Sequence, residues 1–217
     1  MKGPAYILWD WNGTLLDDTG AALATLNKML FRRHRPQIGM DFYLDNFGFP
    51  VKPFYESIGV CLENEDWDAL AREYHDIYAK EDKSLNAQAF EALEAVKARG
   101  AGQSVISALR QDLLDEITAR LGVAGFMDFI YGVDNLDGRS KVERARELVA
   151  RLASEGLVGD VGDAVLVGDS LHDKEVADAI GARCVLCAQG SHAYWRLAAV
   201  APTGRTLPEA VALAFRD

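Results

Sequence analysis

The chain carries the stretch Asp10-Trp11-Asn12-Gly13-Thr14-Leu15-Leu16 directly after the apolar run Ala5-Tyr6-Ile7-Leu8-Trp9. A short apolar run that stops at a charged residue predicts a buried strand. The Asn12-Gly13 pair is a turn signal, so this strand is expected to end in a tight loop. The carboxylate of Asp10 is thereby predicted at the carboxyl end of a strand, where parallel sheets bind their ligands.

The chain after residue 85 alternates between short apolar runs and amphipathic segments with helical spacing. Strands are predicted around residues 105–106, 129–131, 164–167 and 184–186, with helices between them. The run Ala164-Val165-Leu166-Val167 is typical of a strand that is buried on both faces. This alternation predicts an α/β domain with a Rossmann-like parallel sheet and helices on both of its faces.

Residues 17–84 interrupt the alternation with a helical pattern. Leu23, Leu26 and Leu30 recur at spacings of three and four, which predicts a helix with one apolar face. Glycine and proline residues then break the middle of the segment into short pieces. The segment is too long to be a connecting loop. We therefore expect a core domain formed by residues 1–16 and 85–217, and an inserted all-α domain formed by residues 17–84.

The composition is that of a globular protein, and the charge argues against two classes of partner. Hydrophobic residues make up 49% and charged residues 26% of the 217 positions. The net charge of −10 disfavours binding to nucleic acid and to anionic membranes. No apolar run approaches the roughly 20 residues that cross a bilayer, and the first residues lack the apolar region of a secretory signal. We expect a cytoplasmic protein without nucleic-acid or membrane partners; the sequence gives no indication of its oligomeric state.

Cys184 and Cys187 form a C-x-x-C pattern, a spacing shared with redox and zinc sites. The segment around them has the pattern of a strand, however, in which positions three apart face opposite sides. The sequence has only three cysteines, so a second pair to complete a zinc site is lacking. We expect Cys184 and Cys187 to be buried as small hydrophobic residues.

Several polar side chains are predicted at the same edge of the sheet. Asp10 follows the first strand, Ser107 the second, and Asp169 the strand at 164–167, while Lys141 opens the helix after the third strand. Two converging carboxylates repel each other unless a cation lies between them. Mg²⁺ suits a site that offers few carboxylates together with water and phosphate oxygens.

Lys141 gives independent support for an anion site. Ser140 and Glu143 have the spacing of a capping box, which places Lys141 in the first turn of its helix. A cation there opposes the helix dipole, a small local cost. A lysine beside the free N–H groups of a helix start also forms a site for an anion. We therefore interpret Lys141 as an anion-binding residue.

Taken in order, these positions resemble the four motifs of the haloacid dehalogenase superfamily. The stretch from Asp10 to Leu16 resembles the first motif, D-x-D-G-T-L, and Ser107 and Lys141 are similar to the second and third. Val167-Gly168-Asp169-Ser170-Leu171-His172-Asp173 resembles the fourth, G-D-x-x-x-D. The helical insert is similar to the C1-type cap domain of phosphoglycolate phosphatases and β-phosphoglucomutases.

The resemblance implies a phosphatase that hydrolyses a small phosphorylated metabolite and uses Mg²⁺ as its cofactor. Asp10 would attack phosphorus and carry the phosphoryl group as an aspartyl phosphate. The implied metal ligands are Asp10, the backbone carbonyl of Asn12, Asp169 and, less directly, Asp173. The groups implied to hold the phosphoryl oxygens are Thr14, Ser107, Lys141 and the loop amides near Gly13 and Ala108. The cap would close over the site and restrict the access of water.

Asn12 departs from the family pattern, because phosphatases of the family carry an aspartate there as general acid and base. An amide has no titratable proton, and general acid–base groups typically contribute about 10² to 10⁴ in rate. Three hypotheses follow. The enzyme hydrolyses esters with good leaving groups or recruits a base from the cap; it is a phosphonate hydrolase; or it is a phosphate-binding or sensing protein with little catalysis.

Other side chains are weaker candidates for a role in the site. Lys28 and Lys52 are the lysines of the insert that would be considered for a phosphonate hydrolase. His172, between Asp169 and Asp173, is a hypothetical substitute base, and His192 is expected in a loop that lines the site. The aromatic residues of the insert are expected to form mainly its core. The segment Phe47-Gly48-Phe49-Pro50 is a candidate for contact with substrate.

Overall fold

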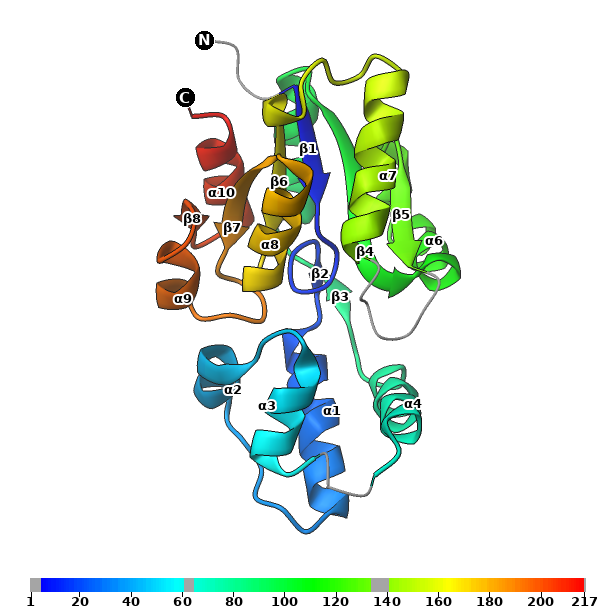
Figure 1. The fold of residues 1–217 in the computed structure, drawn as a ribbon, viewed down its shortest axis with the longest axis vertical. Coiled ribbons are helices and arrows are strands. Elements are labelled where there is room, and N and C mark those ends of the chain that lie inside the picture. The colour runs from blue at the N-terminus through cyan, green and yellow to red at the C-terminus, as the bar shows by residue number, and fades with distance from the viewer. Residues whose placement is uncertain (1–4, 61–64, 134–140, 217) are drawn as a thin grey trace.

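The computed structural model of the protein describes residues 5–60, 65–133 and 141–216. Figure 1 shows two lobes, a larger one that contains the sheet and both ends of the chain, and a smaller helical one below it. The large lobe contains all strands of one six-stranded sheet, and the small lobe contains the first four helices. Two connections, each carrying a short strand, join the lobes.

The sheet of the large lobe is parallel throughout, with the strand order β5-β4-β1-β6-β7-β8. Its strands are β1 (Tyr6–Trp9), β4 (Gly102–Arg110), β5 (Ile130–Val133), β6 (Ala164–Gly168), β7 (Arg183–Cys187) and β8 (Thr203–Gly204). The first strand lies in the middle and pairs with β4 on one side and β6 on the other. Their carboxyl ends all point toward the small lobe (Figure 1).

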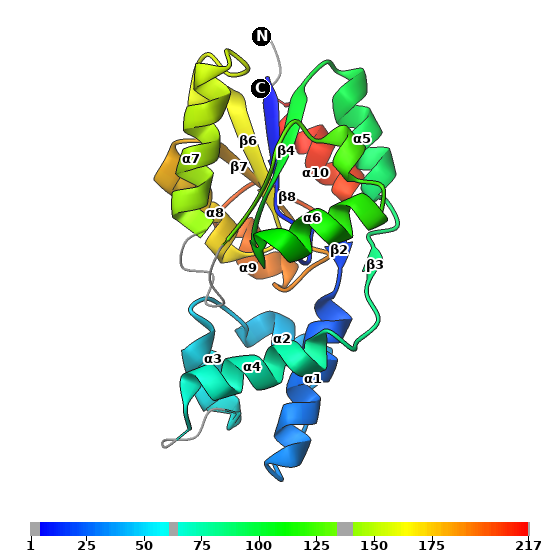
Figure 2. The same ribbon diagram turned by 90° about the vertical axis from the view of Figure 1, so that its right-hand side faces the viewer.

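Helices cover both faces of the sheet. Successive side chains of β1 point to opposite faces and pack against the helices on each side. Ile7 and Trp9 belong to one hydrophobic cluster, while Tyr6 and Leu8 belong to the other. Figure 2 shows the two helical layers on either side of the sheet. The first cluster packs against α5 (Ala89–Ala98), α6 (Gln111–Arg120) and α10 (Leu207–Ala214). The second packs against α7 (Lys141–Ser154) and α8 (Leu171–Ile180).

Shorter elements complete the large lobe. They are the 3-10 turns Ala124–Phe126 and Val161–Asp163, and the short helix α9 (Tyr194–Ala198) between β7 and β8. The start of α8 is fixed by a capping box, in which Ser170 accepts from the amide of Asp173 while Asp173 accepts from the amide of Ser170. This cap sets the direction of the segment that follows β6.

The small lobe has a hydrophobic cluster of its own, built around Leu26, Leu30, Tyr43, Phe54 and Leu70. Its helices are α1 (Thr19–Arg32), α2 (Met40–Asn46), α3 (Val51–Ile58) and α4 (Trp67–Tyr78). The strands β2 (Leu16–Asp17) and β3 (Ser84–Leu85) pair antiparallel where the chain enters and leaves the lobe. We call α1 to α4 the cap.

The structure confirms the predicted fold class, a parallel sheet with helices on both faces and an inserted helical unit. Two details of the strand prediction were wrong. The second predicted strand is much longer than residues 105–106, and β8 adds an edge strand after what was taken as the last one. Cys184 and Cys187 pack on opposite faces of the sheet, as expected. Within the described residues, no helix is both long and apolar enough to cross a membrane.

Candidate active site

The carboxylate of Asp10 lies at the carboxyl end of β1, next to the ammonium group of Lys141. Lys141 is the first residue of α7 and is only 3% exposed. Its Nζ donates to Asp10 Oδ1 at 2.5 Å and to Asp173 Oδ1 at 2.7 Å. Ser140, the capping residue expected from the sequence, lies outside the described residues. Lys141 therefore joins the ends of β1 and the start of α8 through one buried cation.

Three buried carboxylates meet here. Asp10, Asp169 and Asp173 each offer an oxygen, and these atoms lie within 4.8 Å of one another. Burial and the charge of Asp173 raise the pKa of Asp10 to about 7, although Lys141 opposes the shift. Burial and the charges of Asp10 and Asp173 also raise the pKa of Asp169 well above its usual range. One lysine therefore does not compensate the negative charge that this cluster carries when it is ionised.

The cluster fits a divalent cation, because hard oxygen donors and uncompensated negative charge are what Mg²⁺ requires. The three carboxylates are not equivalent. Asp173 accepts from Lys141 with one oxygen, and from Ser170 Oγ and two backbone amides with the other. Burial opposes ionisation of Asp173, but Lys141 and Ser170 outweigh it and lower its pKa. Asp10 and Asp169 are thus the more available donors, and Asp173 holds Lys141 in place.

Ser191 is a site residue that the sequence analysis missed. Its backbone amide donates to Asp169 Oδ2 at 2.5 Å, and its hydroxyl donates to the same oxygen at 2.6 Å. Ser191 follows Gly190, where a Cβ atom would lie 2.2 Å from that oxygen. The residue lies beyond the carboxyl end of β7, so the strand-end rule that found Asp10 and Asp169 could also have found it.

Glycine is required in the loop that follows Asp10. Gly13 has a φ of +75°, and a Cβ atom there would lie 2.4 Å from Asp169 Oδ2. Thr14 donates from its hydroxyl to Asp10 Oδ2 at 3.2 Å. The loop therefore brings its backbone against the carboxylates with no side chain between them.

Ser107 lies at 1% exposure beneath the cavity, where its hydroxyl accepts from the amide of Leu109 at 3.0 Å. Ala108, the next residue, lines the cavity itself. Of the groups expected at the end of β4, Ala108 lines the cavity together with Leu109, whereas Ser107 is buried and is not among the lining residues.

The side chain of Asn12 is held by two groups that the sequence analysis did not single out. Its amide donates to Asp18 Oδ2 at 2.7 Å and to the hydroxyl of Tyr78 at 3.1 Å. Tyr78 also donates to Asp18, and the backbone amide of Gly13 donates to Asp18 Oδ1 at 2.7 Å. Asp18 precedes α1 and Tyr78 ends α4, so this network connects the loop after β1 with the cap.

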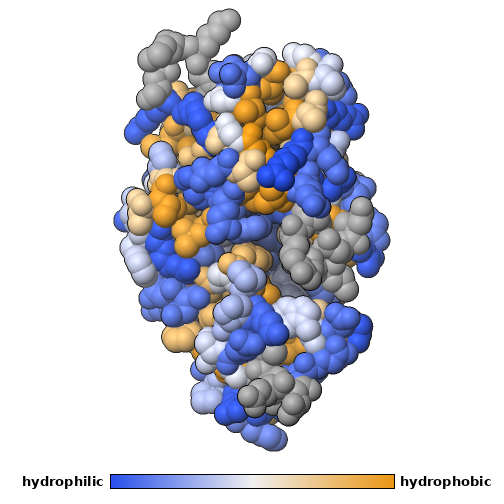
Figure 3. Space-filling view, in the orientation of Figure 1, coloured by the Kyte–Doolittle hydropathy of each residue, from blue (hydrophilic) through white to orange (hydrophobic). Residues whose placement is uncertain are grey.

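A cavity of about 520 Å³ opens above these groups, between the large lobe and the cap. Figure 3 shows the surface hollowed between the two lobes. Asp10, Asn12, Lys141 and Asp169 line it from the large lobe, and aromatic side chains line it from the cap. Asp10, Lys141 and Asp169 therefore face one open space between the two lobes.

Comparisons with known proteins identify the family of this chain. The model of the family described as haloacid dehalogenase-like hydrolase matches residues 7–187. The chain belongs to this family. It is 27% identical to a phosphoglycolate phosphatase of Caulobacter vibrioides, over 82% of this chain and 75% of the relative. It is 25% identical to the pyrophosphatase PpaX of Bacillus velezensis, over 77% of this chain and 75% of that protein.

The fold of the family is shared with solved structures at low sequence identity. Protein tyrosine kinase A of Mycobacterium tuberculosis superposes with a TM-score of 0.77, at 21% identity and with 99% of each chain covered. The prediction of a haloacid dehalogenase-like phosphatase is thus confirmed at the level of family and enzyme class.

The weaker candidates from the sequence are placed as follows. Lys28 pairs with Glu81, Lys52 lies 4.0 Å from Glu56, and neither lines the cavity. His172 does line the cavity, where its Nδ1 lies 3.1 Å from Glu175. His192 is buried behind Ser191 and is not among the lining residues, contrary to expectation. The positions of Lys28 and Lys52 thus give no support to the hypothesis that a lysine of the cap assists the hydrolysis of a phosphonate.

The aromatic residues of the cap divide between core and cavity. Phe54 is buried in the cap core, and Phe42 is exposed. Phe47 and Phe49 line the cavity, and the ring of Phe49 lies 5.2 Å from the ring of His172. The segment Phe47-Gly48-Phe49-Pro50 thus borders the cavity.

Proposed function

We propose that the protein is a magnesium-dependent phosphatase that removes phosphate from a small organic phosphate ester through a phosphorylated Asp10. The observation that supports this most strongly is the position of Asp10 in the cavity between the lobes, where it lies 2.5 Å from a buried lysine and close to the carboxylate of Asp169. The relatives named phosphoglycolate phosphatase and pyrophosphatase support a phosphorylated small-molecule substrate.

In the proposed reaction a carboxylate oxygen of Asp10 attacks phosphorus, and the bond from phosphorus to the ester oxygen breaks. The alcohol leaves with a proton taken up from solvent. Water then attacks the aspartyl phosphate, which releases inorganic phosphate and restores the Asp10 carboxylate. Lys141 stabilises the ionised form of Asp10 and lies where it can donate to a phosphoryl oxygen. Thr14 orients Asp10 from the other side.

Asp10, Asp169 and the backbone carbonyl of Asn12 are the groups that would hold Mg²⁺, with Asp173 contributing through Lys141 or water. When bound, the ion would supply positive charge that reduces the repulsion between the phosphoryl oxygens and the carboxylate of Asp10. Ser191 fixes Asp169 with two hydrogen bonds, so that its remaining oxygen is directed toward Asp10 and Thr14.

Asn12 limits the chemistry that this site performs well. Its amide carries no titratable proton and is held by Asp18, so we infer that residue 12 does not protonate the leaving alcohol. Substrates with acidic leaving groups, such as aryl phosphates, which release a phenolate, and acyl phosphates, which release a carboxylate, need no such proton. We therefore expect turnover to fall steeply as the pKa of the leaving alcohol rises.

The test compares wild type with Asp10→Asn and with Asp17→Asn, whose aspartate is exposed at the end of β2. Each protein is incubated with Mg²⁺ and a series of aryl phosphates, and released phosphate is measured. We expect turnover by wild type and Asp17→Asn, none by Asp10→Asn, and a phosphorylated Asp10 peptide by mass spectrometry after rapid acid quench. Turnover by Asp10→Asn equal to wild type would refute the proposed nucleophile.

A second candidate, a phosphate-binding protein without turnover, is favoured by one observation, the amide at position 12. Adding Asn12→Asp to the same series separates the two functions. Binding of phosphate with turnover only in Asn12→Asp would show that the site is competent and that the natural protein binds rather than hydrolyses.

A further inference from the structure

Three tyrosines of the cap line the cavity, and their hydroxyls have no hydrogen-bond partner among the described residues. Tyr43, Tyr55 and Tyr74 line the same space as Asp10. Tyr43 and Tyr55 are 2% and 6% exposed, yet none of the described residues forms a hydrogen bond with any of the three hydroxyls. Hydroxyls without a protein partner are available to form hydrogen bonds with a ligand or with water.

These hydroxyls are neutral donors and acceptors. Burial raises the pKa of all three tyrosines, and the carboxylate of Asp18 raises those of Tyr43 and Tyr74 further. A phenol that stays protonated can donate one hydrogen bond and accept others. It therefore suits a ligand that carries hydroxyl groups.

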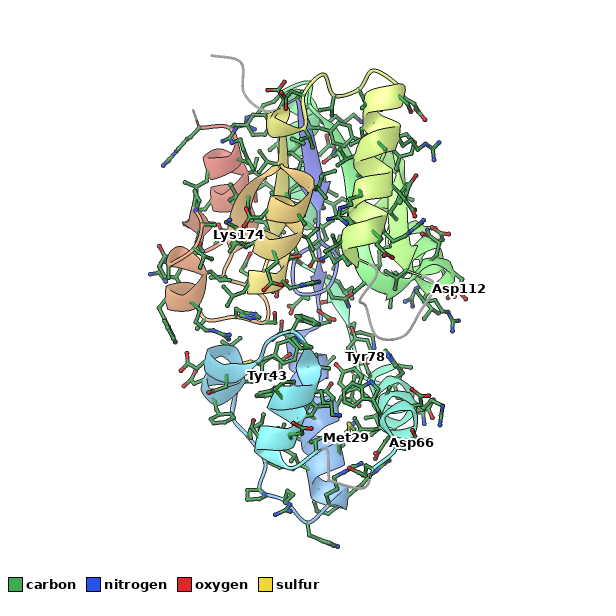
Figure 4. All side chains as sticks on the ribbon, viewed as in Figure 1. Met29, Tyr43, Asp66, Tyr78, Asp112 and Lys174 are labelled. Atoms are coloured by element: carbon green, nitrogen blue, oxygen red, sulfur yellow. The ribbon has the colours of Figure 1, made fainter. Side chains whose placement is uncertain are left out.

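The rings that carry the hydroxyls belong to two groups of aromatic side chains that line the cavity, together called the aromatic wall. The ring of Tyr55 lies 6.1 Å from Trp67 and 6.2 Å from Tyr74, and Tyr74 stacks on Tyr78 at 5.7 Å. On the other side, Tyr43 stacks on Phe47 at 4.7 Å. Figure 4 places the labelled Tyr43 and Tyr78 on the side of the cap that faces the large lobe. Such a wall presents flat apolar faces to a ring of similar size.

The charges that line the cap side of the cavity disfavour a substrate whose organic part carries a negative charge. Asp18 and Asp68 are the carboxylates contributed there. Among the described lining residues, Lys141 is already bonded to two aspartates, and Arg72 has a side chain that is 62% exposed and lies 3.8 Å from Asp66. A carboxylate on the organic part of a substrate would approach the carboxylates of Asp18 and Asp68, which repel a like charge.

The size of the cavity favours a substrate larger than a two-carbon acid. Its volume of about 520 Å³ lies within the range of roughly 300–1,000 Å³ that holds drug-sized ligands. A phosphate group with two further carbons would leave the aromatic wall uncovered. A ring-sized group would reach the tyrosine hydroxyls while its phosphate lies at Asp10.

Resting on the proposed phosphatase function, we propose that the substrate is a phosphate monoester whose organic part is uncharged, ring-sized and hydroxylated. The phosphate lies against Asp10 and Lys141, the ring lies against the aromatic wall, and its hydroxyls bond Tyr43, Tyr55 and Tyr74. Phosphoglycolate, the substrate in the name of one relative, has no ring, and its organic part carries a negative charge.

The first test measures binding and turnover of two matched pairs of esters. One pair is para-(hydroxymethyl)phenyl phosphate and para-carboxyphenyl phosphate; the other is hydroxyethyl phosphate and phosphoglycolate. In each pair a hydroxymethyl group is replaced by a carboxylate at nearly constant size. Dissociation constants are measured calorimetrically with Asp10→Asn and Mg²⁺, and kcat/KM with wild type.

We expect the neutral member of each pair to bind at least tenfold more tightly, and the aryl pair to bind more tightly than the two-carbon pair. Tighter binding of either carboxylate, or no binding of any ester, would overturn the proposed substrate class. The phosphatase proposal fails separately, when wild type turns over none of the esters. Because binding is measured in the inactive variant, the substrate class is decided in either case.

The second test measures whether each cap hydroxyl interacts with the hydroxyl of the ligand, by removing the two hydroxyls separately and together. Tyr43→Phe, Tyr55→Phe and Tyr74→Phe are compared on para-(hydroxymethyl)phenyl phosphate and on para-tolyl phosphate, which lacks the hydroxyl. At least one variant is expected to lose about fivefold in affinity for the first ester and little for the second. Tyr194→Phe, in α9 outside the cavity, is the control. Equal losses on both esters in all three variants would contradict a direct hydrogen bond.

Discussion

The side-chain amide of Asn12 donates to a carboxylate oxygen of Asp18 at 2.7 Å. An aspartate at position 12, as the family pattern has it, would place two carboxylates at this distance. Asp18 also accepts from the backbone amide of Gly13 and from Tyr78. The amide at position 12 and the acid at position 18 therefore form one unit, which couples the loop after β1 to the cap.

From this pairing we expect Asn12→Asp to lower the stability of the protein. Exchanging the two residues, Asn12→Asp with Asp18→Asn, should restore part of the lost stability. The single variant loses a hydrogen bond and gains a like-charge contact, which we expect to lower the free energy of unfolding by about 2 kcal/mol at pH 8. Asn12→Asp combined with Asp18→Asn restores one donor and one acceptor and should recover more than half of the loss. Urea unfolding of wild type, both single variants and the double variant measures the coupling. Additive losses would show that the two side chains act independently.

Gly13→Ala is expected to abolish most activity. The Cβ atom would lie 2.4 Å from Asp169, and a φ of +75° strains any residue with a side chain. A displacement of the metal-binding carboxylate by about 1 Å lowers kcat/KM by about 100-fold. Gly20→Ala is the matched control, because that glycine lies in α1 with nothing near its Cβ position. The control should keep its activity and gain up to about 1 kcal/mol of stability.

Removal of Mg²⁺ is expected to lower the melting temperature more at pH 8 than at pH 6. The pKa of Asp10 is raised to about 7, and that of Asp169 is also raised, so the folded protein holds protons that the unfolded chain releases. Stability without metal therefore falls as the pH rises from about 4 through 7, the usual sign for raised carboxyl groups. An ion that binds the ionised cluster offsets this loss. At 100 times its dissociation constant it contributes about 2.7 kcal/mol, or roughly 5–10 °C at this chain length.

The comparison that checks this is thermal melting with EDTA and with Mg²⁺ at both pH values. Asp169→Asn should abolish most of the shift, whereas Asp17→Asn, exposed in β2, should retain it. A shift of the same size in Asp169→Asn would place the ion elsewhere.

The sequence predicts the fold and much of the carboxylate cluster, because both follow from regular patterns. Strands that are buried on both faces are recognised in the sequence as apolar runs. Side chains that follow the ends of parallel strands meet at one edge of the sheet. Strand ends predicted Asp10 and Asp169, a helix start predicted Lys141, and the resemblance to the family implied Asp173; the structure brings all four together.

The cap side of the site was not predictable by the same means. Asp18 and Tyr78 are 60 residues apart, and only the packing of α1 against α4 brings them into contact. Tyr55 and Tyr74 pack in the cap core, as expected for the aromatic residues of the insert, but they also border the cavity. A helical pattern shows which residues are apolar but not which of two neighbouring surfaces they cover.

Arg196 is expected to hold the cap closed at one edge. Its Nη1 donates to the carbonyls of Leu44 at 2.8 Å and Phe47 at 2.7 Å, from α9 in the large lobe. Arg196→Ala removes both bonds, so we expect faster hydrogen exchange over residues 42–48 and a several-fold rise in KM. Arg205→Ala, which loses only a contact with the ring of Tyr194, should change neither. Unchanged exchange in Arg196→Ala would mean that other contacts suffice to hold the cap.

His192 is expected to make the protein sensitive to acid. Its ring lies behind Ser191, 6.1 Å from the ring of Phe47, and its Nε2 is buried without a partner among the described residues. Burial, assisted by the charge of Arg196, lowers its pKa to about 4. Between pH 6.5 and 4 the unfolded chain therefore binds a proton that the folded protein does not, so stability falls as the pH falls through this window.

The loss assigned to His192 is about 2 kcal/mol between pH 7 and pH 5, from the difference between the two pKa values. Urea unfolding at pH 7, 6 and 5 measures it. His192→Gln removes the titrating ring, so its free energy of unfolding should vary less with pH by this amount, even though lost packing lowers it at pH 7. His34→Asn, at an exposed position with a φ of +54° that asparagine tolerates, controls for the loss of an imidazole. A pH slope in His192→Gln that equals the wild-type slope would assign the acid sensitivity to other groups.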